Sequence, residues 1–356
     1  MRVSFQPMLV NGAVGDPALF VDFAYQKRAL LFDLGDLHAL PPRKILRVTD
    51  VFVSHAHVDH FIGFDWLLRI CLGRERFIRL FGPPGFLAQV EHKLHAYTWN
   101  LVQNYASDFA LLVHEIFPDG QGRRALFRCR TAFLREQEEI HTHVDGIMHA
   151  EPGFQVRAAF LDHRTPCLAY ALEEGEHLNV WKSRLQALGL DCGPWLQELK
   201  RAVMAGLPDD TPILAGWRDR AGPHERALPL GRLRNEILHV SSGQKIVYVT
   251  DAAYHAANAA RIVALAHDAD ELFIEGTFLD CHAQRAAEKG HLTARQAGDL
   301  ARRAHARRAT PFHFSPVHKH EIAALQQEFA QAYGAAAQHD STHPQAFALA
   351  TIPDHN

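Results

Sequence analysis

Apolar residues alternate with polar ones, or cluster in short runs, over the first 60 residues of the chain. Such runs are typical of β-strands that are buried on one or both faces. Helical spacing follows, with Phe64, Leu67 and Cys71 on one face, so helices are expected to cover these strands. The expected strands are 18–23, 29–33, 48–54 and 77–81, and the expected helices are 61–73 and 86 to about 105.

A similar succession of strands and helices begins at residue 154. Within it, a polar, helix-prone segment separates the first strands from the later ones. Two groups of strands, each followed by helices, predict an α/β protein with two sheets faced by helices. We therefore expect a single domain, 1–356, with an inserted helical arm at 175–215. The expected strands are 154–161, 166–171, 245–250, 271–278 and 311–315, and the expected helices are 293–308 and 321–333.

Composition narrows the class of protein. Of the 356 residues, 47% are hydrophobic and 22% charged, and no apolar run approaches the roughly 18 residues that a membrane span needs. The five cysteines are scattered without a Cys-x-x-Cys pair, which argues against a disulfide framework or a thiolate zinc site and favours the cytoplasm. The net charge of -3 gives no global positive field, so a nucleic acid would need a local basic patch.

Three histidines and an aspartate lie together in His55-Ala56-His57-Val58-Asp59-His60, after an apolar strand and before a helix. Residues two apart on a helix point away from each other, so His55, His57 and Asp59 can share an ion only from a loop or a strand end. Neutral imidazole and carboxylate suit zinc, with manganese or iron as substitutes. The hexad therefore predicts a metal site, and a histidine-rich exposed loop is the alternative.

A second histidine-rich run, 140–146, has the pattern His141-x-His143-x-Asp145 but lacks the final histidine of the hexad. The charged segment 135–139 precedes it, where the hexad has an apolar strand. We expect this run to be an exposed segment and not a metal site.

Single ligand residues stand near the ends of several expected strands further along the chain. His163 follows one strand, Asp251 closes the next, and His313 interrupts a third. His291 lies just before Thr293-Ala294-Arg295-Gln296, a capping-box pattern that starts a helix. Each residue alone is more often structural, but together with the hexad they supply the ligands that a two-metal site requires.

The order of these motifs resembles the metallo-β-lactamase superfamily and, within it, the ribonuclease Z branch of tRNA 3′-processing endonucleases. The hexad is similar to the superfamily motif, which by itself indicates only a metallohydrolase. Four other segments resemble the ribonuclease Z branch: 161–170 its isolated histidine ligand, 274–278 with 291–294 its Glu and His loop, 313–316 its last ligand, and 188–195 with Leu199-Lys200 the Gly-Pro segment of its tRNA-gripping arm.

The resemblance implies a four-layer αββα sandwich that holds two divalent metal ions, zinc or alternatively manganese or iron. It implies that Asp59 orients or deprotonates the attacking water, and that His291, held by Glu275, protonates the leaving 3′-oxygen. The ligands that it implies are His55, His57 and His163 for one metal, Asp59, His60 and His313 for the other, and Asp251 between them.

The resemblance also implies a precursor tRNA substrate, gripped by an arm that includes Gly193, Pro194 and Lys200. It further implies a homodimer in which one subunit's arm serves the other's site, with an interface near 61–73 and the helix from Phe86. Two segments depart from the family pattern, because 6–12 replaces a Gly-rich segment and Thr250-Asp251-Ala252 replaces Gly-Asp-Thr. Both departures leave the ligands intact.

Three functions remain open from the sequence. The first is a binuclear phosphodiesterase of the ribonuclease Z type, acting on precursor tRNA or another phosphodiester. The second keeps the metals and hydrolyses a small molecule, such as a cyclic nucleotide, aryl ester, sulfate ester or lactone. The third is a scaffold that only binds RNA or a partner, against which the complete set of ligands argues.

Overall fold

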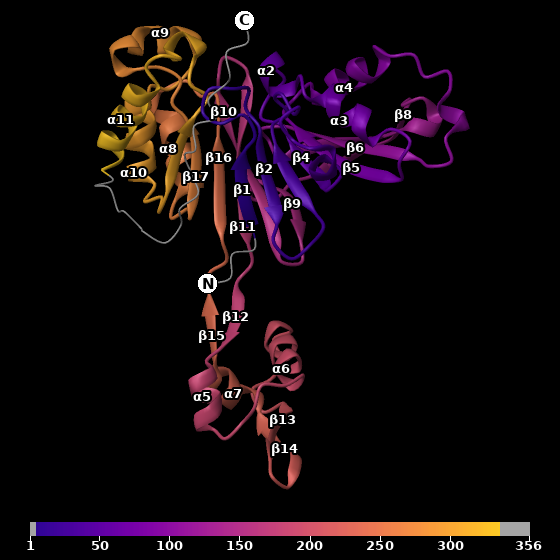
Figure 1. Ribbon diagram of the computed structural model, residues 1–356, viewed down its shortest axis with the longest axis vertical. Helices are drawn as coiled ribbons and strands as arrows, with labels where there is room; N and C mark the ends of the chain where they lie inside the picture. Colours follow the sequence, from indigo (N-terminus) through magenta and orange to yellow (C-terminus); the bar gives the residue numbers. More distant parts are fainter. Residues whose placement is uncertain (1–4, 335–356) are drawn as a thin grey trace, which may run out of the picture.

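The computed structural model describes residues 5–334 of the chain (Figure 1). Its first half forms an eight-stranded sheet in which each strand lies beside its neighbours in the sequence. The strands are β1 (Phe5–Leu9), β2 (Leu19–Phe23), β3 (Ala29–Phe32), β4 (Val48–Phe52), β5 (Arg76–Gly82), β6 (Phe109–Ile116), β7 (Gln121–Arg128) and β8 (Arg135–Thr142).

The second half forms a six-stranded sheet with the order β18-β17-β16-β11-β10-β9. Strands β16, β17 and β18 are parallel, and β10 runs in the same direction because β11 between them is antiparallel to both β10 and β16. The strands are β9 (Ile147–Glu151), β10 (Phe154–Asp162), β11 (Pro166–Glu174), β16 (Lys245–Val249), β17 (Glu271–Glu275) and β18 (Ala309–Phe312).

Helices cover the outer face of each sheet, so the expected αββα sandwich is confirmed (Figure 1). Helices α1 (Pro42–Ile45), α3 (Phe64–Cys71) and α4 (Phe86–His95) pack on the first sheet, and α8 (Ala256–Ala266), α10 (Ala294–Arg303) and α11 (Ile322–Tyr333) pack on the second. A third apolar cluster fills the space between the sheets, around Phe32, Tyr170 and Tyr248. Among residues 5–334, no helix is long and apolar enough to cross a membrane.

A slender arm projects from the sandwich (Figure 1). Its stalk is the antiparallel pair β12 (His177–Val180) and β15 (Leu238–Ser241). Its head has an apolar core of its own, which includes Trp195, Leu199 and Leu233. The head contains α5 (Lys182–Ala187), α6 (Trp195–Met204), β13 (Pro212–Asp219), β14 (Gly222–Pro229) and α7 (Leu230–Ile237).

The arm is longer and less helical than the expected helical segment 175–215. It runs from 177 to 241, because α5 and α6 bury their apolar faces only against the β13–β14 hairpin and α7. Two further expectations differ from the structure. Helix α4 ends at His95 instead of near 105. At this end the Trp99 indole N–H donates to the Leu94 carbonyl at 2.8 Å. The charged segment 135–142 is the strand β8.

Candidate metal centre

The hexad lies where β4 leaves the core. After this strand the chain turns through His55 and His57 into the short helix α2 (Val58–Phe61), which carries Asp59 and His60. Gly63 ends this turn against the loop after β3, where a Cβ atom would lie 2.0 Å from the Gly35 carbonyl oxygen. Only glycine permits this approach, so it holds the hexad against the sheet.

The second sheet supplies the other candidate residues from a single edge. His163 directly follows β10, and His313 directly follows β18. Asp251 is the second residue after β16, and Glu275 is the last residue of β17. Because these four strands run in the same direction, their carboxyl ends meet at one edge. His291 joins them from the loop between α9 (Ala283–Lys289) and α10.

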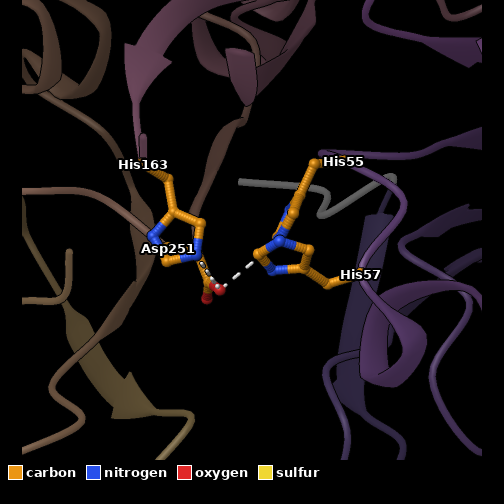
Figure 2. Close-up of side chains that lie close together, drawn as sticks. All are labelled: His55, His57, His163 and Asp251. Carbon is orange, nitrogen blue, oxygen red and sulfur yellow. Dashed lines mark ion pairs between the residues drawn. The ribbon is translucent and has the colours of Figure 1, made fainter. Parts of the chain in front are cut away.

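The Asp251 carboxylate lies at the centre of these residues, 98% buried (Figure 2). Its Oδ2 lies 3.5 Å from His55 Nε2, 3.4 Å from His60 Nε2 and 3.3 Å from His163 Nε2. His57 points toward the same space from the hexad side. The potential ligand atoms of His55, His57, His163 and Asp251 all lie within 4.8 Å of one another.

A second group of potential ligands also approaches Asp251. His313 Nδ1 is 2.9 Å from Asp251 Oδ1, and His313 Nε2 is 3.3 Å from Asp59 Oδ2. His60 Nε2 lies 3.6 Å from the same Asp59 oxygen. Asp59, His60 and His313 therefore form a compact group of their own.

The residues present fit divalent cations. The Nε2 atoms of His55 and His60 are buried without a hydrogen-bond partner, and His313 Nδ1 approaches Asp251 without hydrogen-bond geometry. Burial and the neighbouring His60 lower the pKa of His55 to about 2, so its ring is neutral and offers a lone pair. Buried imidazole lone pairs gathered around a carboxylate are the donor set that zinc and similar divalent ions prefer.

The opposite ring nitrogens are held by other groups, which fixes the orientation of each ring. His55 Nδ1 lies 3.0 Å from Ser54 Oγ, and His163 Nδ1 lies 2.7 Å from the Gly290 carbonyl oxygen. His60 Nδ1 lies 2.9 Å from Asp33 Oδ2. Asp33 was not among the residues expected at the site from the sequence. It directly follows β3, which lies beside β4, and so stands, like Asp251, at the carboxyl end of a strand.

His291 and Glu275 form a buried pair beside the two groups. His291 Nδ1 lies 2.9 Å from Glu275 Oε2 and 3.9 Å from Asp251 Oδ1. The other oxygen of Glu275 accepts from the Ala252 backbone N–H at 2.6 Å. Although burial opposes the change, the Glu275 carboxylate raises the pKa of His291 above its ordinary value, which suits a proton donor.

The remaining sequence candidates lie away from this centre. His141 and His143 face each other with their Nε2 atoms 2.8 Å apart, and no third ligand completes a metal-binding group with them in the described part of the chain. Gly193 and Pro194 directly precede α6 in the arm, and Lys200 lies on α6. The structure thus brings together all nine catalytic and ligand candidates, and places the three arm candidates in the head of the arm (Figure 1).

Comparisons with known proteins agree with this arrangement. The Beta-lactamase superfamily domain model matches residues 228–314, which include Asp251, Glu275, His291 and His313. A relative named Ribonuclease Z from Deinococcus radiodurans is 31% identical over 317 residues, which cover 86% of this chain and 90% of the relative.

Two solved structures share the fold. Human tRNase Z, short form, has a TM-score of 0.50 and 18% identity, with 88% of this chain and 92% of that chain covered. Unliganded yeast PDE1 has a TM-score of 0.52 and 9% identity, with 94% of each chain covered. These two structures show the fold alone, whereas the relative named Ribonuclease Z is 31% identical over most of both chains. The chain therefore belongs to the ribonuclease Z family of the metallo-β-lactamase superfamily, a family of metal-dependent hydrolases.

Proposed function

We propose that this protein is a tRNA 3′-end endonuclease that cuts a precursor tRNA after its discriminator nucleotide. The observation that carries the proposal is the convergence of seven candidate ligands and the His291–Glu275 pair at one edge of the sandwich. A scaffold that only binds RNA has no chemical need for this set. Its relative from Deinococcus radiodurans bears the name Ribonuclease Z, which supports the same reaction.

We assign two divalent ions to the centre, zinc by preference and manganese or iron as substitutes. His55, His57 and His163 would hold one ion, Asp59, His60 and His313 the other, and Asp251 would contact both. When bound, such ions would lower the pKa of a water molecule and neutralise charge on the phosphoryl oxygens.

Asp59 is the residue that we assign to the attacking water. Burial by itself would raise the pKa of Asp59. The hydrogen bond from His313 and the charge at His60 outweigh burial and lower this pKa to about 2. The carboxylate is therefore ionised at neutral pH and can accept a hydrogen bond from the water. Its side chain is 39% exposed, so it can reach the substrate as well as the ligands.

His291 is the residue that we assign to the leaving group. Its Nδ1 faces Glu275, which leaves Nε2 to carry a proton into the adjoining cavity, whose wall includes His291. As the bond between phosphorus and the 3′-oxygen breaks, this proton passes to the oxygen and the 3′-hydroxyl leaves. Glu275 stabilises the imidazolium before transfer and keeps the ring in one orientation.

The arm is the part that we assign to the body of the tRNA. Lys200 and Arg201 on α6 are candidates for contacts with phosphates, and Gly193 and Pro194 shape the turn that leads into that helix. Arg184 stacks on Trp181, with 3.3 Å between the guanidinium carbon and the ring centroid. Phosphate contacts position a nucleic acid without reading its sequence, which is what binding of many different tRNAs requires.

We also propose a homodimer that works in the cytoplasm. Val58 within the hexad and Ile62 just after it expose 72% and 47% of their surface, and Ile62 belongs to the segment 61–73 where the interface is expected. The cysteines of the described chain are all free, which is compatible with a reducing compartment. Light scattering of the purified protein tests the dimer, and a monomer at micromolar concentration would contradict it.

Incubation with a 3′-extended tRNA precursor tests the proposed function. We expect one cut after the discriminator nucleotide, which leaves a 3′-hydroxyl on the tRNA and a 5′-phosphate on the trailer. A chromogenic bis-aryl phosphate serves as the second substrate, because it reports the chemistry without the arm. Hydrolysis of that diester without any cut in the precursor would favour the small-molecule hydrolase instead.

A further inference from the structure

A cavity of about 290 Å³ opens beside His291. Its wall includes Asp59 and His313 of the metal centre, Phe278, and the side of α9 that carries Arg285 and Lys289. The volume is at the lower limit of pockets that enclose a whole small molecule, roughly 300 to 1,000 Å³. The cavity therefore suits the reacting part of a larger substrate, with the rest of that substrate outside it.

Arg285 and Lys289 are one helical turn apart on α9, so they lie on the same face. Both side chains are exposed, and neither has an acidic partner within ion-pair distance among residues 5–334. Other arginines nearby are neutralised, since Arg295 pairs with Asp280 at 3.4 Å and Arg302 with Asp299 at 2.5 Å. Two unpaired cations on one cavity wall attract an anion.

Arg285 is held in position relative to the proposed proton donor. The Arg285 guanidinium carbon lies 5.8 Å from the centroid of the Phe278 ring, and that ring lies 6.1 Å from the His291 ring. This cation–π contact holds Arg285 over a buried aromatic residue beside His291.

The backbone at Lys289 is held by the residue that follows it. Gly290 ends α9 with φ +74°, and its carbonyl oxygen accepts a hydrogen bond from His163. A Cβ atom at this position would lie 3.2 Å from His163 Nδ1, so the end of α9 is in direct contact with the metal centre. The exposed side chain of Lys289, which lies on the cavity wall, therefore extends from a backbone position beside the metal centre.

We infer that Arg285 and Lys289 bind the phosphate that precedes the scissile one, on its 5′ side. The inference rests on the proposed function, because His291 would protonate the 3′-oxygen that belongs to the preceding nucleotide. That nucleotide would therefore lie on the His291 side, where both cations are. Outside the proposed ligands, the remaining charged residue of the cavity wall is Asp16, whose carboxylate repels a second phosphate.

This assignment defines the class of substrate. An anion site next to the scissile phosphate has a use only when the substrate carries two consecutive phosphodiesters. The geometry points to a polynucleotide with a single-stranded end, and not to a lone cyclic or aryl diester. The site adds affinity without reading a base, because it contacts phosphate alone.

Salt dependence of RNA binding tests the inference on the metal-loaded protein. Fluorescence anisotropy with labelled hexauridylate gives the slope of log K against log salt. Arg285→Ala and Lys289→Ala are each expected to reduce its magnitude, and the double variant by about 0.7, the value for one single-strand phosphate contact. Arg285→Lys keeps the charge and should keep the slope. Arg295→Ala is the matched control, since it removes an exposed arginine that is already ion-paired, and its slope should equal that of the wild type.

Kinetics give a second, independent readout. In Arg285→Ala, the kcat/KM for precursor tRNA should fall about tenfold relative to that for a bis-aryl phosphate, mainly through KM. Unchanged slopes in both alanine variants would overturn the inference, and so would an equal loss on both substrates, which indicates a distorted centre. Failure of the proposed function looks different, because the wild type would then leave the precursor uncut whatever the slopes.

Discussion

The side chains of Asp33 and His60 meet in the interior, with Asp33 Oδ2 2.9 Å from His60 Nδ1. Both residues are completely buried. Asp33 also accepts from the Ser54 backbone N–H at 2.6 Å and from the Tyr248 hydroxyl at 2.9 Å. The aspartate therefore holds the imidazole so that Nε2 faces Asp251 from the opposite sheet.

Replacement of this aspartate should weaken metal binding. Asp33→Asn keeps the side-chain volume but removes the charge that orients His60. We therefore expect the metal affinity to fall roughly 10- to 100-fold, the range for residues that hydrogen-bond to a metal ligand. Competition with a chromogenic chelator measures the affinity. Asp36→Asn is the matched control, because Asp36 is exposed and its carboxylate contacts the backbone N–H and the ring of His38. Wild-type affinity in Asp33→Asn would contradict the orienting role.

The need for a proton donor should depend on the leaving group. We expect His291→Ala and Glu275→Gln to lower kcat on precursor tRNA by roughly 10²- to 10⁴-fold, the usual contribution of general acid catalysis. A bis-aryl phosphate should lose much less, because an aryloxide leaves without a proton. Glu321→Gln is the control, since Glu321 forms a similar pair with His318, at 2.7 Å, outside the cavity wall. Equal losses on both substrates would show that the pair supports the fold or the metals instead.

The arm should be needed for tRNA and dispensable for the chemistry. Gly175 and Gly243 lie at the base of the stalk, where a Cβ atom on Gly243 would be 2.5 Å from the Gly175 carbonyl oxygen. Deletion of 176–242 with direct joining of these glycines therefore removes the arm and its separate core together. We expect cleavage of precursor tRNA to fall by roughly 100-fold or more as phosphate contacts are lost, while bis-aryl phosphate hydrolysis stays within about threefold. Full activity on the precursor would remove the arm from the proposed function.

A charged network that joins the two sheets should give a pH-dependent stability. Hydrogen bonds from Arg28 hold the pKa of Glu151 at about 2, below its ordinary value of 4.5, and Arg79 donates to the same carboxylate at 2.7 Å. Because the folded pKa is the lower one, this stabilisation is complete above pH 4.5 and is lost as the pH falls toward 2.

Thermal melts of Glu151→Gln against the wild type measure this effect. At neutral pH we expect a loss of roughly 1 kcal/mol, since the carboxylate is partly exposed and solvent screens the pairs. The difference should narrow between pH 4.5 and 2. Glu139→Gln removes the partner of Arg124 from an exposed pair and should have little effect at any pH. A difference for Glu151→Gln that does not vary with pH would contradict the assigned cause.

The candidate centre was more predictable from the sequence than the elements around it. His163, Asp251 and His313 could be found because a ligand at a strand end interrupts an apolar run. Asp33 stands at a strand end as well, but nothing in the local pattern indicates that its strand lies parallel to the hexad strand. That pairing depends on contacts across the sheet, which periodicity does not record.

The arm and the outer strands were less predictable for the same reason. The helical spacing of α6 is visible in the sequence, whereas the stalk forms by pairing His177 with Ser241 across 64 residues. Half of the residues in β8 are charged, and Arg135 pairs with Glu91 on α4 while Glu139 pairs with Arg124 on β7. This charged segment therefore forms a strand because residues on neighbouring elements pair with its charges. Its own sequence pattern does not indicate those partners.

The central claim is that the ligands gathered around Asp251 hold two metal ions. Metal analysis of the purified protein after dialysis against zinc tests it most directly, with Asp251→Ala as the comparison. We predict two ions per chain in the wild type and a clear loss in the variant, because Asp251 belongs to the first ligand group and also lies 3.4 Å from His60 and 2.9 Å from His313 of the second. A wild-type protein that binds no zinc, manganese or iron would contradict the claim, as would one that binds two ions equally well without Asp251.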